Sequence, residues 1–355
     1  MGKIKIAIIG CGYWGQNLIR NFSDLAEVEV VAVCDFSLSA LARVKRNFPR
    51  VALKQDYEQI LSDWRIHAVV IATPVSTHYP FAERGLRAGK HVLIEQPLAT
   101  STQQALELLE LADEHDRLLM VDHTFIYTGA VRHIKTLVDT GGLGKLLYFD
   151  SVRISLGMVQ SDTNVIWDLA PHDFSILDHL CSERPMAVSA IGAKSLGHPF
   201  ENIAYLMVHF DGNMIAHIHV NWLAPVKVRK TLIGGTRKTI VYDDLESLEK
   251  LKIYDGVPPM RANELHEDYP AALNRAPGIF APILDRTEAL SLVAREFVDA
   301  IRGERLPVSD GYAGYRVVRL LEAAQRSLQQ GGQLVELRDP LRLRNSTPTF
   351  TELDA

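Results

Sequence analysis

The stretch IIGCGYWG, residues Ile8 to Gly15, decides the fold that this sequence predicts. A short strand-like run, Lys5–Ile9, leads into its glycines, and a run with helical spacing, Gln16–Phe22, follows them. A strand that turns at glycines directly into a helix is typical of the first unit of a parallel, nucleotide-binding sheet. The N-terminus of that helix offers free N–H groups and a positive dipole end to phosphates.

Each glycine of this turn has its own task in such a unit. Gly10 permits the tight turn, Gly12 lets the backbone approach a pyrophosphate, and Gly15 lets the helix pack closely against the strand. Tyr13 and Trp14 lie in the same turn and belong to the predicted cofactor-binding residues. The stretch therefore predicts a dinucleotide-binding loop.

An acidic residue at the end of the next strand supports this interpretation. Asp35 follows the strand-like run Val28–Cys34 and lies twenty residues beyond Gly15 (35 − 15). A carboxylate there can accept hydrogen bonds from ribose hydroxyls and would repel a 2′-phosphate. The nearest arginine after it is Arg43. We therefore expect NAD as the cofactor, in preference to NADP.

The first third of the chain continues the alternation of strands and helices. This spacing indicates βαβ units, a parallel sheet and helices on both of its faces. The expected fold class is α/β, with a doubly wound Rossmann sheet over residues 1–123 and a second domain over residues 124–355. Further expected strands are Val28–Cys34, Ala68–Ala72, His91–Ile94 and Leu118–Val121, and expected helices are Leu38–Phe48 and Gln103–His115.

The pattern changes after residue 122, where most strands follow one another without helices between them. Such runs indicate an open, mostly antiparallel sheet in a C-terminal α/β domain. Asp211–Gly212 is a hairpin signal, because this pair supplies the positive φ angles of a tight turn, and Pro258–Pro282 is predicted to be a long loop. The expected strands are Leu146–Ile154, Met186–Lys194, Ile203–Phe210, Met214–Trp222, Lys230–Gly234, Thr239–Tyr242 and Leu248–Tyr254, and the expected helices are Val131–Asp139, Val165–Leu180, Leu292–Arg302 and Ala313–Gln329.

The composition excludes several classes of protein. The chain has 355 residues, of which 47% are hydrophobic and 23% charged, as expected for a soluble globular protein with two domains. Its net charge of −5 argues against nucleic acid as a main partner, and no run of about 18 apolar residues could span a membrane. Cys11, Cys34 and Cys181 lie far apart, which suits a reducing cytoplasm and argues against a disulfide framework or a thiolate metal site.

Two further stretches end at the carboxyl edge of the predicted parallel sheet, where ligands bind in such folds. In IATPVSTH, residues 71–78, Pro74 gives a rigid turn and Thr73 can contact the cofactor. His78 begins the next helix, and a cofactor contact there is as plausible as simple packing on the loop.

In HVLIEQPLAT, residues 91–100, the strand ends on polar groups. Glu95 and Gln96 would project toward the nicotinamide, and Pro97 favours an extended backbone at Gln96 and allows a cis bond. The alternative is a strand end with polar caps.

The helix WDLAPHDFSILDHL, residues 167–180, carries a possible acid–base pair. Asp168 and His172 are four residues apart, so they share one face of a helix. A carboxylate beside an imidazole can fix its tautomer, which suits general acid–base chemistry. A capping Asp168 and a packed His172 are the alternative. Pro171 fits a first helical turn better than a helix interior.

Three other histidines suggest zinc only weakly. His217 and His219 alternate on one expected strand, and His209 lies on a neighbouring one. Three imidazoles can hold zinc, but no acidic fourth ligand is evident in this pattern. We therefore predict no metal site.

Taken together, GCGYWG, Asp35, ATPVSTH, EQP and the helix with Asp168 and His172 resemble the Gfo/Idh/MocA oxidoreductase family. The stretches TFIYTGAVRHIKTLVDTGGLGKLLYFDSVRISLG and EFVDAIRGERLPVSDGYAGYRVVRLLEAAQRSL are also similar to that family. The resemblance implies a Rossmann domain, a C-terminal domain on an open sheet, and a nicotinamide cofactor. It also implies a sugar, inositol or nucleotide-sugar substrate, and a homodimer or homotetramer formed through the C-terminal sheet.

The resemblance also implies roles for single residues. Glu95 and Pro97 match the family's Glu-Lys-Pro motif, and Asp168 and His172 match its catalytic pair. Gln96 stands where the family has a lysine that binds a substrate hydroxyl. An amide keeps hydrogen-bonding reach but loses the positive charge and the ability to exchange a proton at neutral pH.

These observations predict an NAD-dependent oxidoreductase that acts on a carbohydrate-like alcohol or ketone. His172 would be the base or acid, Asp168 would orient it, and Gln96 would position the substrate. The alternatives are an NAD-binding homologue that has lost hydride chemistry because of Gln96, by natural loss or engineering, and a related lyase or epimerase. Candidates for the substrate side are Lys145, Arg153 and Tyr127.

Overall fold

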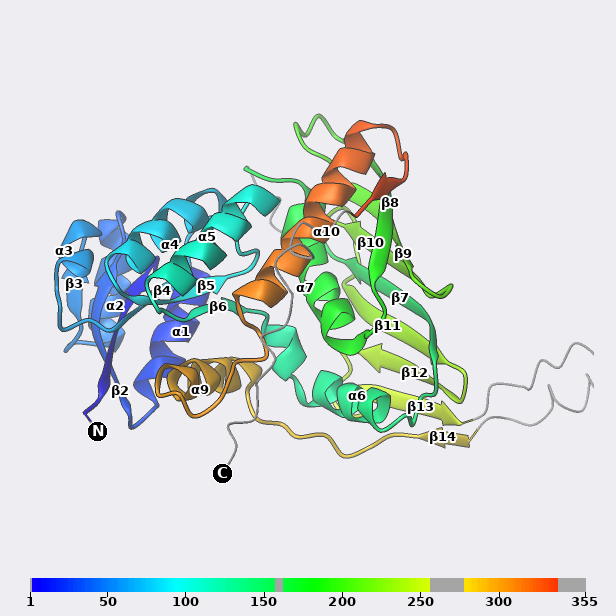
Figure 1. Cartoon of the computed structure of the whole chain (residues 1–355), viewed down its shortest axis with the longest axis horizontal. Helices are drawn as coiled ribbons and strands as arrows, with labels where there is room; N and C mark the ends of the chain where they lie inside the picture. Colours follow the sequence, from blue (N-terminus) through cyan, green and yellow to red (C-terminus); the bar gives the residue numbers. More distant parts are fainter. Residues whose placement is uncertain (1, 157–161, 256–277, 338–355) are drawn as a thin grey trace, which may run out of the picture.

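Two β-sheets, one parallel and one mostly antiparallel, organise the computed structural model, which describes residues 2–156, 162–255 and 278–337 (Figure 1). The parallel sheet is built from the first part of the chain and the antiparallel sheet from the second. The fold class predicted from the sequence is thereby confirmed.

The parallel sheet has six strands in the order β3-β2-β1-β4-β5-β6. Its strands are β1 (Ile4–Ile9), β2 (Val28–Cys34), β3 (Ala52–Lys54), β4 (Ala68–Ile71), β5 (His91–Glu95) and β6 (Leu119–Asp122). All four residues of β4 are buried, as expected for a parallel sheet covered on both faces. The strand order changes direction between β1 and β4, and at such a point a crevice opens outside the carboxyl ends of the strands.

Helices cover both faces of this sheet. On one face pack α1 (Tyr13–Ser23), α2 (Leu38–Asn47) and α9 (Ala289–Ile301). On the other pack α4 (His78–Arg87), α5 (Thr102–Glu114) and α10 (Gly311–Gln329). The two late helices α9 and α10 therefore return to the first sheet after the chain has built the second.

The second sheet has nine strands in the order β14-β13-β12-β11-β7-β10-β9-β8-β15. Only the β7–β10 pair among its strands is parallel within the described residues. The strands are β7 (Leu146–Ile154), β8 (Pro185–Ala193), β9 (Ile203–Phe210), β10 (Ile215–Asn221), β11 (Val228–Gly235), β12 (Lys238–Asp243), β13 (Leu251–Asp255), β14 (Gly278–Phe280) and β15 (Val335–Glu336).

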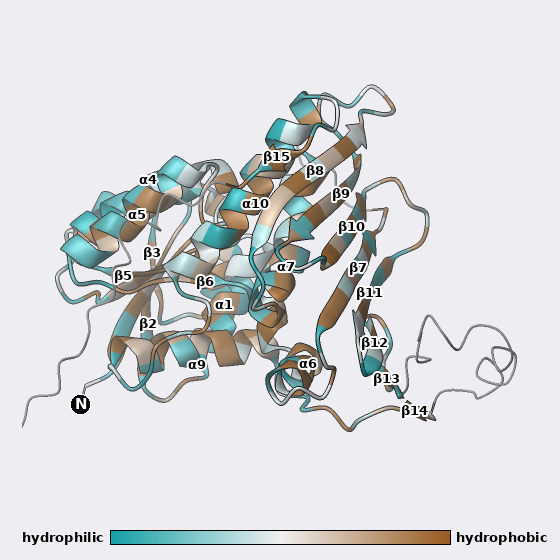
Figure 2. Ribbon diagram, turned by 45° about the vertical axis from the view of Figure 1, so that its right-hand side comes forward, coloured by the Kyte–Doolittle hydropathy of each residue, from teal (hydrophilic) through white to brown (hydrophobic). Residues whose placement is uncertain are grey.

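One side of the second sheet is covered by helices. Figure 2 shows α6 (Gly129–Asp139), α7 (Val165–Leu180) and α10 on the side that faces the parallel sheet. Alternate strand residues point to this side and are buried, as Ala204 and Leu206 of β9 illustrate. The predicted acid–base pair of α7, Asp168 and His172, is thus held between the two sheets.

Several local predictions need correction. Helix α1 begins at Tyr13 and not at Gln16, and Pro171 lies inside α7 and not in its first turn. The positive φ angles of the β9–β10 turn belong to Gly212 and Asn213, one residue later than expected.

The prediction of a long loop over Pro258–Pro282 is also wrong in part, because residues 278–280 pair with β13 as strand β14. Residues 256–277 lie outside the described part. The short elements β3, β15 and α3 (Glu58–Leu61) were not predicted. Among the described helices, none is long and apolar enough to cross a membrane.

Candidate active site

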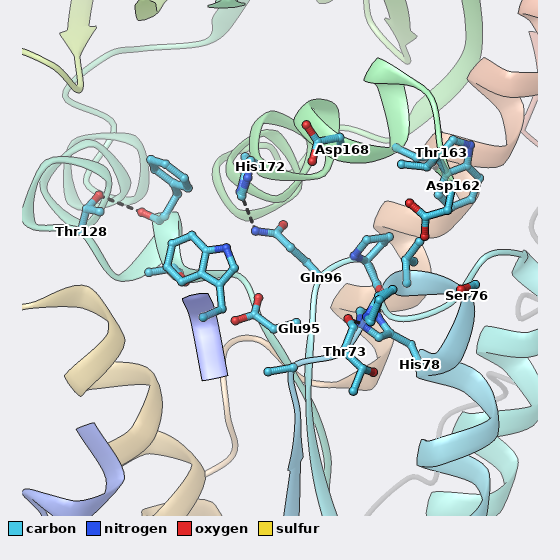
Figure 3. A pocket seen from close by; sticks show the side chains of 18 residues that line it. Thr73, Ser76, His78, Glu95, Gln96, Thr128, Asp162, Thr163, Asp168 and His172 are labelled. Carbon is cyan, nitrogen blue, oxygen red and sulfur yellow. Dashed lines mark hydrogen bonds between the residues drawn. The ribbon is translucent and has the colours of Figure 1, made fainter. Parts of the chain in front are cut away.

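A cavity of about 650 Å³ opens at the carboxyl end of the parallel sheet, between that sheet and α7 (Figure 3). It is bordered by the loops after β4, β5 and β6 and by the start of α7. None of the described residues that line it is a lysine or an arginine. The lining residues are Trp14, Ala72, Thr73, Pro74, Val75, Ser76, His78, Glu95, Gln96, Pro97, Thr124, Phe125, Thr128, Asp162, Thr163, Trp167, Asp168 and His172.

The glycines of the first turn differ in what surrounds them. Gly10 has a φ angle of +87°, and a Cβ there would lie 2.4 Å from the carbonyl oxygen of Ala72. A Cβ on Gly15 would lie 2.1 Å from the carbonyl oxygen of Gly10, so the helix packs against the turn too closely for any side chain. A Cβ on Gly12 would meet nothing within 4 Å. The turn therefore leaves open space at Gly12, where a pyrophosphate is expected to approach.

Asp35 is tied to this turn. Its Oδ2 accepts a hydrogen bond from the backbone N–H of Cys11 at 2.8 Å, and its Oδ1 accepts one from the backbone N–H of Ser37 at 2.8 Å. Burial, together with Asp35, raises the pKa of the Cys11 thiol to about 12, so this thiol stays neutral. The carboxylate thus stands beside the phosphate loop, as the expected ribose contact requires.

The two aromatic residues of the turn lie near the surface. Trp14 is 50% exposed and lines the cavity, and Tyr13 is 76% exposed. Their rings meet edge to face, with centroids 5.2 Å apart. Of the two, only Trp14 is among the residues that line the cavity.

His78 joins two loops of the site. Its Nδ1 lies 2.8 Å from the carbonyl oxygen of Pro97, and its Nε2 lies 2.8 Å from the carbonyl oxygen of Thr73. The ring is buried, and this burial lowers the pKa of His78. Both ring nitrogens therefore face the backbone, and His78 holds the loops after β4 and β5 together. Pro74 lies in the first of these loops and lines the cavity.

Two carboxyl groups lie side by side at this edge of the sheet, Glu95 at the cavity wall and the buried Asp122 next to it. Glu95 of β5 is aligned with Asp122 of β6 in the parallel ladder. Burial and the neighbouring carboxyl group raise the pKa of Glu95 well above its usual value, and burial raises the pKa of Asp122 to about 6. The hydroxyl of Thr124 donates to Asp122 Oδ1 at 2.6 Å. The pair therefore tends to hold a proton near neutral pH.

Gln96 reaches across the cavity to His172. The Nε2 atom of Gln96 lies 2.6 Å from Nδ1 of His172, as Figure 3 shows by a dashed line. The Gln96–Pro97 peptide bond is cis. Burial, and then the charges of Arg153 and Arg229, lower the pKa of His172 well below its usual value. The imidazole is therefore neutral at physiological pH, and Nε2 is the ring nitrogen left for a ligand.

Asp168 lines the same cavity from the same helix but has a different partner. Its Oδ2 accepts a hydrogen bond from the indole N–H of the buried Trp222 at 2.8 Å. The sequence analysis predicted that Asp168 orients His172 and that Gln96 holds the substrate. The structure shows a hydrogen bond between Gln96 and His172 and one from Trp222 to Asp168, and both of these roles remain predictions.

The start of α7 is fixed by its cap. Oδ1 of Asn164 accepts hydrogen bonds from the backbone N–H groups of Ile166 and Trp167, at 3.1 and 3.3 Å. The indole N–H of Trp167 donates to Gln325 of α10 at 3.3 Å. This cap sets where α7 begins, and the helical spacing then places Asp168 and His172 over the cavity.

Sequence reasoning missed several residues of the site. Asp122 could have been found, because the aligned strands β5 and β6 both end on an acid. Phe125, whose ring centroid lies 5.0 Å from that of His172, and Trp222 have no sequence signal that connects them with the site.

The three substrate-side candidates are placed elsewhere. Arg153 is buried in an ion pair with Asp173 at 2.9 Å, and Tyr127 donates to the buried Glu296. Neither they nor Lys145 line the cavity. No group of three or more His, Cys, Asp or Glu residues that could hold a metal occurs in the described ranges.

Comparisons with known proteins agree with this geometry. Residues 4–123 match the model of an oxidoreductase family with an NAD-binding Rossmann fold, and residues 131–241 match the GFO/IDH/MocA C-terminal domain. The chain is 32% identical to the uncharacterized oxidoreductase YdgJ of Escherichia coli, over 72% of this chain and 76% of that protein.

Two further relatives carry more specific names. UDP-N-acetylglucosamine 3-dehydrogenase of Acidithiobacillus ferrooxidans is 27% identical, over 90% of this chain and 95% of that protein. The structure of GenD2 from gentamicin A biosynthesis, in complex with NAD, superposes with a TM-score of 0.80 at 22% identity, covering 96% of this chain and 97% of that one. At this level of identity, the likeness to GenD2 shows only that the two proteins share a fold.

Proposed function

Because the chain belongs to the Gfo/Idh/MocA family of oxidoreductases, we propose that it transfers hydride between NAD and a carbinol or ketone carbon of a sugar, nucleotide sugar or related polyol. The observation that carries this proposal is that Gln96 and His172 meet in a crevice that Trp14 of the glycine turn also lines, while Asp35 is hydrogen-bonded to that turn. The dehydrogenase acting on a nucleotide sugar among the relatives supports a carbohydrate-like substrate.

The residues present fit NAD. The open space at Gly12 suits a pyrophosphate, and the Asp35 carboxylate beside it suits the ribose hydroxyls. Thr73, Pro74 and the Glu95–Gln96 strand end would border the nicotinamide, and Trp14 lines the same space. When bound, NAD supplies the hydride acceptor, and NADH the hydride donor.

His172 then handles the proton. In oxidation its Nε2 takes the hydroxyl proton as the carbinol becomes a carbonyl, and in reduction the same nitrogen returns a proton to the oxygen. The low pKa of His172 keeps the imidazole neutral and so ready to accept a proton. Asp168 lies on the same helix face, and Trp222 fixes its carboxylate at the cavity wall.

The lining of the cavity favours substrates without a negative charge at the reacting centre. No lysine or arginine lines it in the described part of the chain, whereas Asp168 and Asp162 do. The nearby guanidinium groups of Arg153 and Arg229 are already paired, with Asp173 and Asp244. A phosphate next to the reacting carbon would find no cationic partner among the described residues that line the cavity.

The test is NADH formation or consumption with a panel of sugars, inositols and nucleotide sugars. The wild-type protein should convert at least one, and His172→Ala should lower kcat by ~100-fold or more, because general base catalysis contributes that much. A fully active His172→Ala protein would refute the role of His172.

A second candidate is an NAD-binding homologue without hydride chemistry. It is favoured by Gln96, whose amide cannot exchange a proton as the family's lysine can. This candidate expects NAD binding with no change in absorbance on any substrate, and a gain of turnover in Gln96→Lys. A lyase or epimerase would form product without any net change in NADH absorbance.

We also propose a homodimer or homotetramer in the cytoplasm. The side of the second sheet turned away from α7 exposes Ile191, Tyr205 and Ile215, by 57%, 43% and 36%. All three cysteines are free thiols, which suits a reducing compartment. Light scattering should show an oligomer, and Tyr205→Lys should shift it toward monomer. A monomeric wild-type protein would refute this assembly.

A further inference from the structure

The contact between Gln96 and His172 involves the Nδ1 atom of the imidazole, and which group donates depends on the tautomer of the ring. Gln96 comes from the loop after β5 and His172 from α7, and the amide meets Nδ1 at 2.6 Å (Figure 3). The other end of the amide, Oε1, is buried and has no hydrogen-bond partner among the described residues. A buried acceptor without a donor lowers the stability of the folded state, so this orientation of the amide leaves Oε1 unsatisfied.

Rotating the amide by half a turn exchanges its oxygen and its nitrogen without changing its shape. In the first orientation, the amide N–H donates to a bare Nδ1, so the neutral ring carries its proton on Nε2. In the second, Oε1 accepts from Nδ1–H, so Nε2 is bare. The two orientations of Gln96 therefore correspond to the two tautomers of His172.

Only the second orientation allows His172 to exchange a proton with a substrate. To take a hydroxyl proton, Nε2 must offer its lone pair, which places the ring hydrogen on Nδ1. After the proton has been taken, both nitrogens carry hydrogen, and Nδ1–H still needs an acceptor. Both states of the working imidazole thus require an oxygen at Nδ1, and Gln96 Oε1 can provide it.

We propose that Gln96 is a positioning residue, which accepts the Nδ1–H of His172 through Oε1 and so keeps Nε2 bare toward the cavity. This inference rests on the proposed function only for the role of His172 as the base, because the tautomer is a property of the chain itself. A lysine at position 96 has donors but no acceptor, so it could not hold this tautomer.

The tautomer can be read directly by ¹⁵N NMR of the full chain labelled at histidine, without substrate. The His172→Gln spectrum identifies the signal of His172. Wild type and Gln96→Glu, which keeps an acceptor, should both show His172 protonated at Nδ1. Gln96→Met, of similar length but without hydrogen bonds, should shift the population toward Nε2–H. Wild-type protein protonated at Nε2, or an unchanged tautomer in Gln96→Met, would overturn the proposal.

Kinetics with any converted substrate give a second measurement. Gln96→Met should lower kcat ~tenfold or more while KM changes less than about twofold, because a positioning residue acts on the chemical step. Gln96→Glu should lose less of kcat than Gln96→Met and move the acid limb of the pH profile upward, since a carboxylate keeps an acceptor at Nδ1 and favours the imidazolium. Gln96→Lys should lose activity.

A rise in KM with unchanged kcat in Gln96→Met would instead show that Gln96 holds the substrate, and would refute the positioning role. A gain of activity in Gln96→Lys would also refute it. If no substrate is converted, the proposed function fails, whereas the NMR result still decides the role of Gln96. Thermal unfolding of each variant checks that the fold is retained.

Discussion

Gly12 and Gly15 stand three residues apart, yet a methyl group would have opposite effects at the two positions. At Gly12 it meets nothing within 4 Å, and at Gly15 it lies 2.1 Å from a backbone oxygen. We expect Gly12→Ala to leave the free energy of unfolding within about 0.5 kcal/mol of wild type. It should weaken NAD binding ~tenfold or more, because the methyl group occupies the space left for the pyrophosphate.

Gly15→Ala is the matched control for this prediction. It should destabilise the protein by roughly 1–3 kcal/mol, because the helix must move away from the turn. Calorimetric titration with NAD and thermal unfolding separate the two effects. Unchanged NAD affinity in Gly12→Ala would show that the pyrophosphate does not approach this glycine.

At the residue scale, the sequence predicted groups whose spacing along the chain is fixed by local geometry. The glycine turn, Asp35 and the Asp168–His172 spacing belong to this kind. Which atom each side chain contacts was not predictable in the same way. Gln96 meets His172 across 76 positions, and this contact depends on how the two sheets pack. The contacts of these side chains therefore became visible only in the structure.

At the scale of elements, the alignment of β5 with β6 predicts a pH dependence of stability. The folded pKa of Asp122 is raised to about 6, so between its unfolded value and pH 6 the folded state binds more protons than the unfolded state. The protonated Asp122 therefore contributes to the free energy of unfolding. This contribution is present in full below the unfolded pKa, near 4, and is lost as the pH rises through 6.

Asp122→Asn should remove this contribution. The free energy of unfolding of Asp122→Asn, minus that of wild type, should rise between pH 4 and pH 7 by on the order of 1 kcal/mol. Urea denaturation at several pH values gives the difference directly. Titrating groups outside the Glu95–Asp122 pair cancel in the comparison, whereas the raised pKa of Glu95 falls when its neighbour loses the carboxyl group. A difference that does not vary with pH would contradict the raised pKa of Asp122.

Helix α7 carries a proline in its interior, which should cost stability. Pro171 has no N–H to donate to the carbonyl of Trp167, one turn earlier. We expect Pro171→Ala to raise the free energy of unfolding by roughly 1–2 kcal/mol, the gain being reduced because alanine makes the unfolded chain more flexible. Chemical denaturation measures this change.

Ala170→Pro, one position earlier, is the control for Pro171→Ala. It should destabilise the protein by about 3 kcal/mol, because it removes an N–H from the helix interior. Equal stability of Pro171→Ala and wild type would mean that the carbonyl of Trp167 is satisfied by another donor.

The length of an element decides whether its hydrophobic pattern can predict it from the sequence. Long amphipathic helices and buried strands were found with ends shifted by a few residues, because their periodicity extends over many positions. The strands β3, β14 and β15 have two or three residues, too few for any period. They exist because a neighbouring strand offers free backbone groups, which only the assembled sheet reveals.

At the scale of the whole molecule, α9 ties the end of the chain to its beginning. Phe297 of α9 is fully buried, and its ring centroid lies 6.1 Å from that of Phe22 in α1. Phe297→Ala should lower the free energy of unfolding by roughly 3–5 kcal/mol. Phe280→Ala, at a ring that is 60% exposed, should change it by less than about 0.5 kcal/mol.

Denaturation followed by circular dichroism checks both variants, with NAD binding as a second reading. If Phe297→Ala unfolds as easily as Phe280→Ala, the contact between α9 and α1 does not stabilise the parallel sheet. The division into residues 1–123 and 124–355 remains a prediction, and these contacts cross it. Two hydrophobic patterns along a chain reveal two sheets, but not a helix that returns from one to the other.

The return of α9 has a consequence for biosynthesis. Phe297 is made 275 residues after Phe22 (297 − 22). At about 5–20 residues per second, the ribosome needs roughly 15–55 s to cover this distance. During that time the apolar surface of α1 that packs against α9 stays uncovered on the nascent chain, although α1 and α2 are already made. Chaperones that hold exposed apolar surface would therefore meet this protein early, and release from them would follow the synthesis of α9 and α10.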